Sequence, residues 1–423
     1  MSKTSNFTWS GDGNNPPIVE AHTKARHQVT EEYLKDWIVT LCGNNRAFSK
    51  KVTIIDGFCG GGVYRDNETS SLYLGSPFKI ISSIEEGLKI VKNTKSKPNY
   101  ELDAEFIFID SRKEHIECLQ KTLKEYAPET YKQCPDNFKF ICNEFENVVD
   151  PIIENLRKRN CSSMFILDPT GYNDVSMRSI RNIIALKKSE IIFTFMTEYI
   201  SRFINLRHGK LKRVHEEILE SEGYFDAINL GELGKPEQQG YLRNETLRLF
   251  RRQANVPFVF SFALIPNQKI VQYFLVHLAS NASAQRVIKS SAWIHNNLWI
   301  GKQYGFSMNG MGFKSPDYYE KSLNLFDIEE ENRQAAIECL SDFIMPLIHS
   351  NEDGILLDLL HQLTMQDNPS TFEHYIQYLL QQRGYGEIEI IREGKATRAQ
   401  TLRNTDIICK SSQVKLFDLK SFS

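Results

Sequence analysis

Several features that would mark a function at once are missing from this 423-residue sequence. The formal net charge at pH 7 is -2, so the chain has no overall positive charge that would attract nucleic acid, and such binding would need a local basic patch. The eight cysteines are scattered and form no Cys-x-x-Cys pair, which argues against a zinc site or a disulfide framework. We expect mostly buried, reduced thiols instead.

Long apolar stretches are also missing. No apolar run approaches the roughly 18 residues that a membrane helix needs. Residues 1–17 are polar and contain no apolar signal core, so we expect a mobile tail on a cytoplasmic protein with no membrane partner. Apolar residues make up 41% of the chain and charged residues 25%, as in water-soluble globular proteins, and the length predicts two or three domains.

Short apolar segments alternate with helical segments in the first half of the chain. The strand-like segments include VTIIDGF, AEFIFID, NFKFICNEF, SSMFILDP and SEIIFTFM, which suit a parallel sheet that is covered on both faces. Residues 18–325 are therefore predicted to form a doubly wound, Rossmann-like α/β domain with helices inserted at about 200–255. Two further apolar segments, Val256–Ile265 and Ile270–Ala279, are predicted to complete the sheet as antiparallel strands.

The C-terminal residues 332–423 follow a different pattern. Three helical stretches precede two strand-like ones, EIEIIRE and TDIICKSSQVKLFDL. A winged helix-turn-helix has this order of three helices followed by a hairpin, so we expect a separate winged-helix-like domain here.

A glycine-rich turn follows the first predicted strand. The stretch DGFCGGG (Asp56–Gly62) places an acid at the strand end and then leaves the backbone nearly bare, which lets the backbone approach a ligand. This pattern is typical of class I methyltransferases, which bind S-adenosylmethionine (SAM). The candidate cofactor-binding residues are Asp56, Gly57, Phe58, Gly60 and Gly62.

The glycine turn does not match two common nucleotide-binding loops. A phosphate-binding P-loop is disfavoured because no Gly-Lys-Ser/Thr follows, and a dinucleotide site because the next helix begins only near Ser76. A tight turn that binds no ligand remains the alternative to a SAM site. The long stretch between Gly62 and Ser76 is a candidate lid over a ligand.

Polar residues also end the next two predicted strands. Asp110 ends AEFIFID, where an acid in this fold accepts the ribose hydroxyls of SAM; its alternative role is to cap the following helix. Asn143 and Glu144 follow the third strand, where a polar side chain commonly meets the adenine amine.

The fourth predicted strand ends in FILDPTGY (Phe165–Tyr172). Amino-methyltransferases carry Asp/Asn-Pro-Pro-Tyr/Phe at this place, where the acid or amide and a carbonyl orient the target amine and the aromatic ring stacks on the base. Asp168 and Pro169 match that motif, and Tyr172 comes one position late. These three are the candidate catalytic residues, with a turn or cap role as the alternative for Asp168.

Basic stretches lie outside these motifs. RFINLRHGKLKR supplies the candidate nucleic-acid contacts Arg202, Arg207, Lys210, Lys212 and Arg213. RNETLRLFRR (Arg243–Arg252) and REGKATRAQTLR (Arg392–Arg403), the candidate wing, are basic as well. A solvated helix face with local ion pairs is the alternative for the first two.

The ordered set of motifs resembles the three-Cys-motif partner protein family (TcmP). The similar stretches are HTKARHQVTEEYLKDW, IIDGFCGGGVY, GSP, FILDPTGY, FTFMTEYISRF, YLRNETLRLF and VQYFLVHLASNASAQRVIKSSAW. The resemblance implies a class I methyltransferase-like fold and a partner protein that carries a three-cysteine, radical-SAM-like motif. The family often has Ala-Gly-Pro-Gly where this chain has Cys59-Gly60-Gly61-Gly62, so the stiffening proline is missing here.

Two functions follow from these observations. The first is a SAM-dependent methyltransferase that acts on a nucleic acid or a nucleotide-like substrate. The second is a non-catalytic SAM- or nucleotide-binding partner or scaffold subunit, in a mobile-element or phage-defence system. The altered Asp-Pro-Thr-Gly turn and the lack of an obvious catalytic base favour the second to some extent.

Overall fold

The computed structural model describes residues 8–43, 47–94, 97–126, 128–169, 174–196, 216–222, 224, 235–265, 271, 273–298, 310–314 and 325–411. The chain divides into two compact units. The first comprises Met1–Asn296 and Gly312–Tyr319, and the second comprises Asn297–Met311 and Glu320–Ser423.

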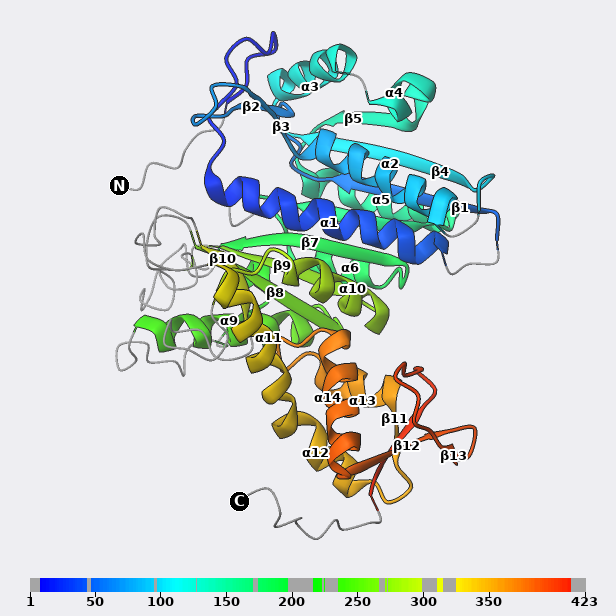
Figure 1. Ribbon diagram of the computed structural model, residues 1–423. Helices are drawn as coiled ribbons and strands as arrows, with labels where there is room; N and C mark the ends of the chain where they lie inside the picture. Colours follow the sequence, from blue (N-terminus) through cyan, green and yellow to red (C-terminus); the bar gives the residue numbers. More distant parts are fainter. Residues whose placement is uncertain are drawn as a thin grey trace. The chain divides into compact units, whose positions relative to one another are not determined.

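The first unit is built on an eight-stranded sheet (Figure 1). Its strands, from one edge to the other, are β5 (Phe138–Cys142), β4 (Glu101–Asp110), β1 (Ser49–Asp56), β6 (Ser162–Leu167), β7 (Ser189–Met196), β9 (Tyr273–Ala279), β8 (Phe258–Ile265) and β10 (Met311–Lys314). The strands from β5 to β7 pair in parallel, and β9 is antiparallel to both β7 and β8. This order is that of the Rossmann-like sheet of class I methyltransferases, so the fold class predicted for the first domain is confirmed.

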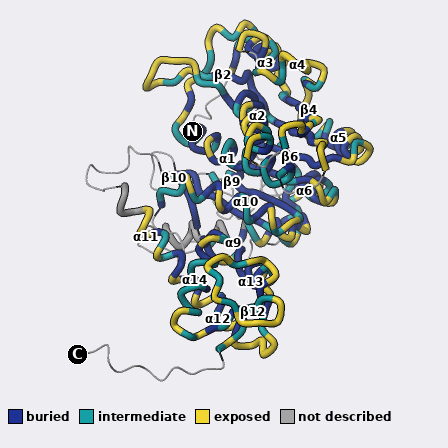
Figure 2. Tube along the Cα trace, turned by 45° about the vertical axis from the view of Figure 1, so that its right-hand side comes forward, coloured by how far each residue is buried: buried dark blue, intermediate teal, exposed yellow. Residues whose placement is uncertain are grey.

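The middle of the sheet is buried on both faces (Figure 2). In β1 the neighbouring residues Ile54 and Ile55 point to opposite faces, and both are less than 2% exposed. All six residues of β6 are buried as well. Strands that read as continuous apolar runs are expected where helices cover both faces of a parallel sheet.

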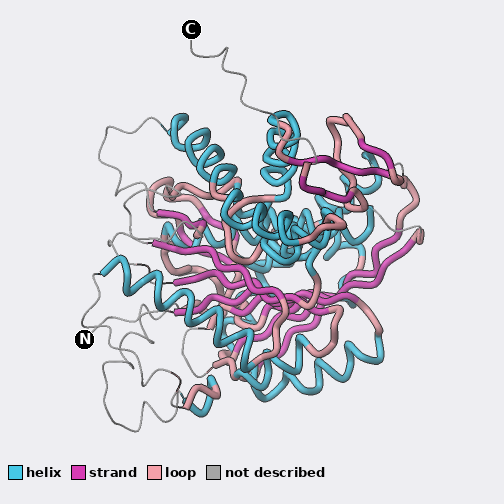
Figure 3. The backbone as a smooth tube through the Cα atoms, turned by 90° about the horizontal axis from the view of Figure 1, so that it is seen from below, coloured by secondary structure: helices cyan, strands magenta, loops and turns pink. Residues whose placement is uncertain are grey.

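Helices cover both faces of this layer of strands (Figure 3). The first face carries α1 (Ala21–Gly43), α2 (Ser76–Thr94) and α10 (Ala282–Trp293), with α1 in contact with the other two. The other face carries α5 (Phe145–Arg159), α6 (Met177–Ile184) and α9 (Lys235–Gln253), with α6 in contact with α5 and α9. The shorter helices α3 (Lys113–Glu125) and α4 (Glu129–Gln133) and the 3₁₀ turn Pro135–Asn137 connect β4 to β5.

A buried polar cluster fixes α1 to the sheet. Glu190 of β7 accepts hydrogen bonds from Tyr33 and from the Trp37 indole, the latter at 3.0 Å, and His277 Nε2 lies 3.0 Å from the same carboxylate. Each partner comes from a different part of the chain, since Tyr33 and Trp37 belong to α1 and His277 to β9. Buried polar groups must be paired, so this cluster specifies how α1 sits on the strands.

The stretch between the glycine turn and α2 forms a hairpin. The strands β2 (Val63–Arg65) and β3 (Leu72–Leu74) pair antiparallel, and the Gly75 amide donates to the Gly62 carbonyl at 2.7 Å. The sequence predicted a loop that folds over a ligand here, and it missed this hairpin.

The N-terminal segment is also more ordered than the sequence suggested. Residues 1–7 lie outside the described residues, but residues 8–17 pack against the domain rather than forming the predicted mobile tail. Trp9 is 7% exposed and its indole donates to the Val63 carbonyl, while the Arg65 amide donates to the Pro17 carbonyl at 2.8 Å. Burial of the Trp9 indole, with its N–H group hydrogen-bonded, holds this segment on the domain although the residues around it are mostly polar.

The second unit contains α11 (Leu325–Glu338), α12 (Leu340–Ser350), β11 (Ile355–Leu356), α13 (Leu357–Thr364), α14 (Phe372–Tyr385), β12 (Ile388–Arg392), β13 (Lys395–Ala396) and β14 (Ile407–Lys410). Its small sheet has the order β11, β14, β12, β13. A cluster of buried apolar residues, with Leu340, Tyr375 and Ile408 among them, forms its core. The predicted order of helices and then strands is present, and the sequence missed the short strand β11.

Among the described residues, no helix is both long enough and apolar enough to cross a membrane.

Candidate functional site

A pocket lies at the carboxyl end of the sheet, where β1 and β6 end. Its lining includes Asp56, Asp168, Arg26, His27, Glu31 and Lys79. The two aspartates follow neighbouring parallel strands, and the other four come from α1 and α2. Ligands of open α/β sheets bind at this edge, so the pocket is the candidate functional site.

Asp56 forms the buried floor of the pocket. Its side chain accepts hydrogen bonds from the Phe58 amide at 3.2 Å and from the Ser76 hydroxyl at 2.5 Å, and the residue is only 1% exposed. Burial raises the pKa of Asp56 to about 7, against the smaller opposing effect of these two hydrogen bonds. A carboxyl group with a pKa near neutrality inside a cleft is a common property of functional sites.

The glycines of the turn meet the protein's own side chains. A Cβ added at Gly61 would lie 2.3 Å from Trp9, and one at Gly57 would lie 2.7 Å from Leu167. Gly60 and Gly62 have φ angles of +58° and +76°, which other residues rarely adopt. Close packing and backbone conformation therefore account for these glycines without a ligand, while Phe58 and Cys59 of the same turn line the pocket.

Asp110 lies at the carboxyl end of β4 but does not line the pocket. Its Oδ2 accepts from the Gly60 amide at 3.1 Å, and its Oδ1 accepts from the Arg112 amide at 2.9 Å and contacts His115 Nδ1 at 3.0 Å. The carboxylate thus ties the glycine turn to the start of α3. Of the two acids that the sequence assigned to SAM, Asp56 therefore lines the pocket and Asp110 does not.

Asn143 and Glu144 follow β5 and are exposed. The Asn143 side chain accepts from the Glu144 amide at 2.9 Å and from the Asn147 side chain at 3.2 Å, which organises the start of α5. Neither residue lines the pocket.

Asp168 points toward a cation from α1. Its Oδ1 forms an ion pair with the Arg26 guanidinium, and the Asp168 side chain is 32% exposed. Pro169 follows it and is buried, while Tyr172 lies outside the described residues. The candidate catalytic acid is therefore in the pocket, as its position at a strand end predicted, but it is not a free carboxylate.

The sequence motifs missed the contribution of α1. Arg26, His27 and Glu31 all belong to the stretch HTKARHQVTEEYLKDW, which carried the family resemblance but was given no role in a site. Glu31 pairs with Lys79 of α2 at 3.0 Å across the pocket wall. The sequence did hold a hint, since many charged and histidine residues lie on a helix that has a buried face. Helical periodicity alone does not show that such residues line a functional site.

None of the described residues of the basic stretches lines the pocket. Arg202, Arg207, Lys210, Lys212 and Arg213 lie outside the described residues. In the second stretch, Arg248 pairs with Glu245 at 2.6 Å and the Arg252 guanidinium lies 5.7 Å from the centre of the Tyr224 ring. Those two arginines fit the alternative of a helix with local partners.

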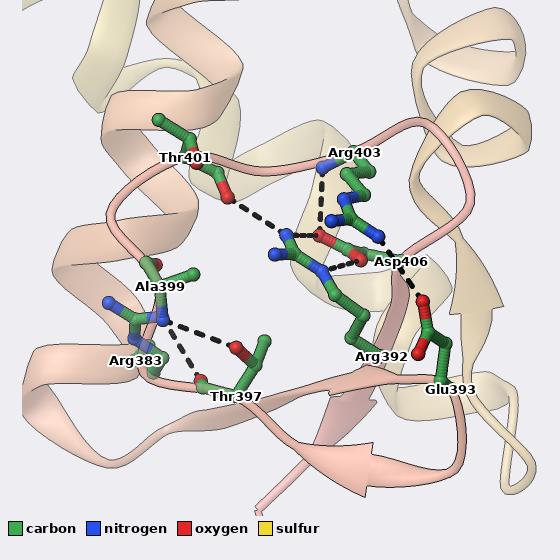
Figure 4. A network of polar contacts seen from close by, with 8 residues as sticks. All are labelled: Arg383, Arg392, Glu393, Thr397, Ala399, Thr401, Arg403 and Asp406. Atoms are coloured by element: carbon green, nitrogen blue, oxygen red, sulfur yellow. Dashed lines mark hydrogen bonds and ion pairs between the residues drawn. The ribbon is translucent and has the colours of Figure 1, made fainter.

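The candidate wing of the second unit holds a polar network (Figure 4). Arg392 makes two hydrogen bonds to Asp406, at 2.8 and 2.7 Å, and one to the Thr401 carbonyl. Arg383 of α14 donates to the carbonyls of Thr397 and Ala399. Two arginines thus hold the loop in place, while Lys395 and Arg398 are exposed at its surface.

The cysteines are single thiols. All eight cysteines are free of disulfide bonds, and five of them are buried, largely as the sequence predicted. Across the described ranges, no group of three or more histidine, cysteine, aspartate or glutamate side chains is arranged to hold a metal ion.

No family model matches the sequence, and no curated protein matches it. Among solved structures, one neighbour is a Legionella pneumophila protein of the family DUF519, with 11% identity and a TM-score of 0.29, over 46% of this chain and 74% of that one. The plantazolicin methyltransferase BamL, in complex with a substrate analogue and S-adenosylhomocysteine, gives 12% identity and a TM-score of 0.25, over 61% and 86%. PKMT2 from Rickettsia typhi, in complex with S-adenosylhomocysteine, gives 11% identity and a TM-score of 0.25, over 87% and 74%. The assignment of the fold class rests on the strand order itself.

Proposed function

We propose that this protein is a SAM-dependent methyltransferase that acts on a nucleic acid or a nucleotide-like substrate. One observation carries the proposal: a class I methyltransferase sheet brings Asp56, the glycine turn and Asp168 to one pocket at its carboxyl edge. Methyl transfer from a sulfonium needs mainly alignment and a proton acceptor, which such a pocket can supply.

The residues present fit one end of SAM better than the other. The pocket offers the carboxyl group of Asp56 as an acceptor for the charged amine of the methionine portion, and Phe58 and Cys59 line it as well. The ribose end would need Asp110, whose two oxygens are already engaged by Gly60, Arg112 and His115. Binding of the whole of SAM therefore requires the ribose hydroxyls to join or replace those hydrogen bonds.

The nucleic-acid part of the proposal rests on sequence. The basic stretch Arg202–Arg213 precedes α9 in the chain, and the C-terminal unit has the helix and strand order of a winged helix. We propose the winged-helix assignment together with the substrate class. A partner with a three-cysteine, radical-SAM-like motif, suggested by the family resemblance, is part of the same proposal.

Calorimetry with S-adenosylhomocysteine tests the site. We expect micromolar binding by the wild-type protein and its loss in Asp56→Ala, because the mutation removes the buried acceptor. The variant Asp168→Ala should keep this binding but lose transfer of label from methyl-tritiated SAM to RNA or DNA oligonucleotides. No heat from the wild-type protein at high ligand concentration would contradict the proposal.

A second function is a non-catalytic SAM- or nucleotide-binding subunit that scaffolds the three-cysteine protein. The Arg26–Asp168 ion pair favours it, since the carboxylate that the sequence motif assigned to the methyl acceptor is already engaged by a guanidinium. In that case S-adenosylhomocysteine would bind equally to the wild-type protein and Asp168→Ala, and neither would transfer label to any oligonucleotide.

A further inference from the structure

A histidine on α1 is fixed in the pocket by one aromatic partner. His27 is 4% exposed and lines the pocket together with Asp56 and Asp168. Its Nδ1 lies 3.1 Å from the Tyr73 hydroxyl, and its ring stacks on Tyr73 with centroids 5.8 Å apart and planes inclined by 8°. The stacking and the hydrogen bond leave the ring a single orientation.

The other ring nitrogen of His27 has no partner. Among the described residues, no group forms a hydrogen bond with Nε2, although the atom is buried. Buried polar atoms are nearly always paired, so a free one that borders a pocket points to a ligand group. His277 Nδ1 also lacks a partner in the described part of the chain, but His277 does not line the pocket.

The surroundings keep the ring neutral. Burial lowers the pKa of His27 well below its usual value, and the cations of Arg26 and Lys79 lower it further. A neutral ring that donates from Nδ1 to Tyr73 presents a lone pair at Nε2. The charged and titratable groups around it are Arg26 and Glu31 of α1, Lys79 of α2, Tyr64 and Tyr73 of the hairpin, and Asp56 and Asp168 at the strand ends.

We propose that His27 is a catalytic residue that accepts, at Nε2, the proton of the N–H or O–H group to be methylated. The inference rests on the methyltransferase function proposed above. Asp168, the acid that the sequence motif suggested for this task, already pairs with Arg26, whereas the buried Nε2 of His27 has no hydrogen-bond partner among the described residues.

The step balances with groups that the pocket and the proposed reaction supply. SAM would supply the methyl group and keep the electron pair of the broken sulfur–methyl bond, and the proton of the methylated N–H or O–H group would go to His27 Nε2. The ring would then carry a positive charge beside Arg26 and Lys79, and their repulsion would favour loss of that proton and return of the neutral ring.

The rate of methyl transfer tests this role. His27→Asn keeps a polar side chain that cannot take up a proton, and we expect kcat to fall about 100-fold or more with methyl-tritiated SAM and either adenosine, an RNA oligonucleotide or a DNA oligonucleotide. Its affinity for S-adenosylhomocysteine should stay within about threefold of wild type, the small change expected of a group that acts on the departing proton rather than on the bound cofactor. Added imidazole should restore part of the rate of His27→Ala.

Nitrogen NMR gives a readout that is independent of activity. In the wild-type protein, Nε2 of His27 should stay unprotonated from about pH 6 to 8, through the range where an ordinary histidine titrates. Lys79→Gln removes one neighbouring cation, so the pKa of His27 should rise and the rate should begin to fall at a higher pH. Tyr73→Phe should mix the two tautomers.

The outcomes separate the two proposals. If the wild-type protein labels a probe and His27→Asn labels it as fast, the role of His27 is wrong and the methyltransferase function stands. If Nε2 carries the proton in the wild-type protein, the role of His27 is likewise overturned. If the wild-type protein labels none of the three probes, both proposals fall together.

Discussion

Two buried aspartates, one in each unit, have pKa values that are shifted in opposite directions. Asp56 of the α/β unit is held by a hydroxyl and an amide, and burial raises its pKa to about 7. Asp406 of the C-terminal unit is held by Arg392, whose hydrogen bonds lower its pKa. The buried carboxyl group of Asp56 has no cation paired with it among the described residues and lowers the stability of the fold, which is a common property of residues in functional sites. The carboxylate of Asp406 is paired with Arg392 and has a structural role.

The pH dependence of stability should show the effect of the raised pKa of Asp56 most strongly. Between about pH 4 and 7 the unfolded chain has lost the Asp56 proton while the folded protein keeps it, so stability falls as pH rises and then levels off. A shift from the ordinary value to about 7 corresponds to a free-energy cost on the order of 4 kcal/mol, at about 1.4 kcal/mol per pKa unit.

The variant Asp56→Asn should remove that slope. Urea unfolding of both proteins at a series of pH values checks the expectation, because the difference between the two curves isolates Asp56 from other titrating groups. Parallel curves between pH 4 and 7 would mean that the folded protein holds Asp56 ionised, and the contrast with Asp406 would be lost.

Removal of the Asp406 carboxylate should lower the stability of the C-terminal unit. In Asp406→Ala the loop between β13 and β14 loses the two hydrogen bonds from Arg392 and the one from the Arg403 amide, and we expect a loss of about 2–3 kcal/mol in the stability of the C-terminal unit. Arg403→Ala, which breaks an exposed ion pair with Glu393, is the matched control and should have no measurable effect.

The expected consequence of Asp406→Ala is structural only. Binding of S-adenosylhomocysteine should not change, since the pocket belongs to the other unit. A variant that unfolds like the wild-type protein would show that the network in Figure 4 does not hold the loop.

A smaller effect tests the reason for the glycine turn. Gly61→Ala places a methyl group against Trp9, and such overpacking should cost about 1–3 kcal/mol. Gly384→Ala in α14 meets no atom within 4 Å and should stabilise the helix by about 0.5–1 kcal/mol. Thermal unfolding of both variants measures the difference, and a neutral Gly61→Ala would show that Trp9 moves readily away from the turn.

Local patterns predicted most of the fold but only part of the site. Apolar segments identified the strands β1, β4, β5, β6, β7, β8 and β9 of the large sheet, because a strand covered on both faces must be apolar along its length. The positions of Asp56, Asp110 and Asp168 at strand ends followed from the same pattern, since parallel strands end at one edge. Their partners did not follow, because Arg26 reaches Asp168 and Trp9 reaches Gly61 across long stretches of chain.

The sequence by itself determined the layers of the α/β unit and the strand ends that carry its acids, because hydrophobic periodicity and glycine conformation act locally. Only the tertiary structure decided what each acid does. Docking of α1 through Glu190 brings Arg26 and His27 to the pocket, and docking of Trp9 covers the glycine turn. Burial and charge pairing arise from contacts between distant segments, so they set the ionisation of these groups only after the chain has folded.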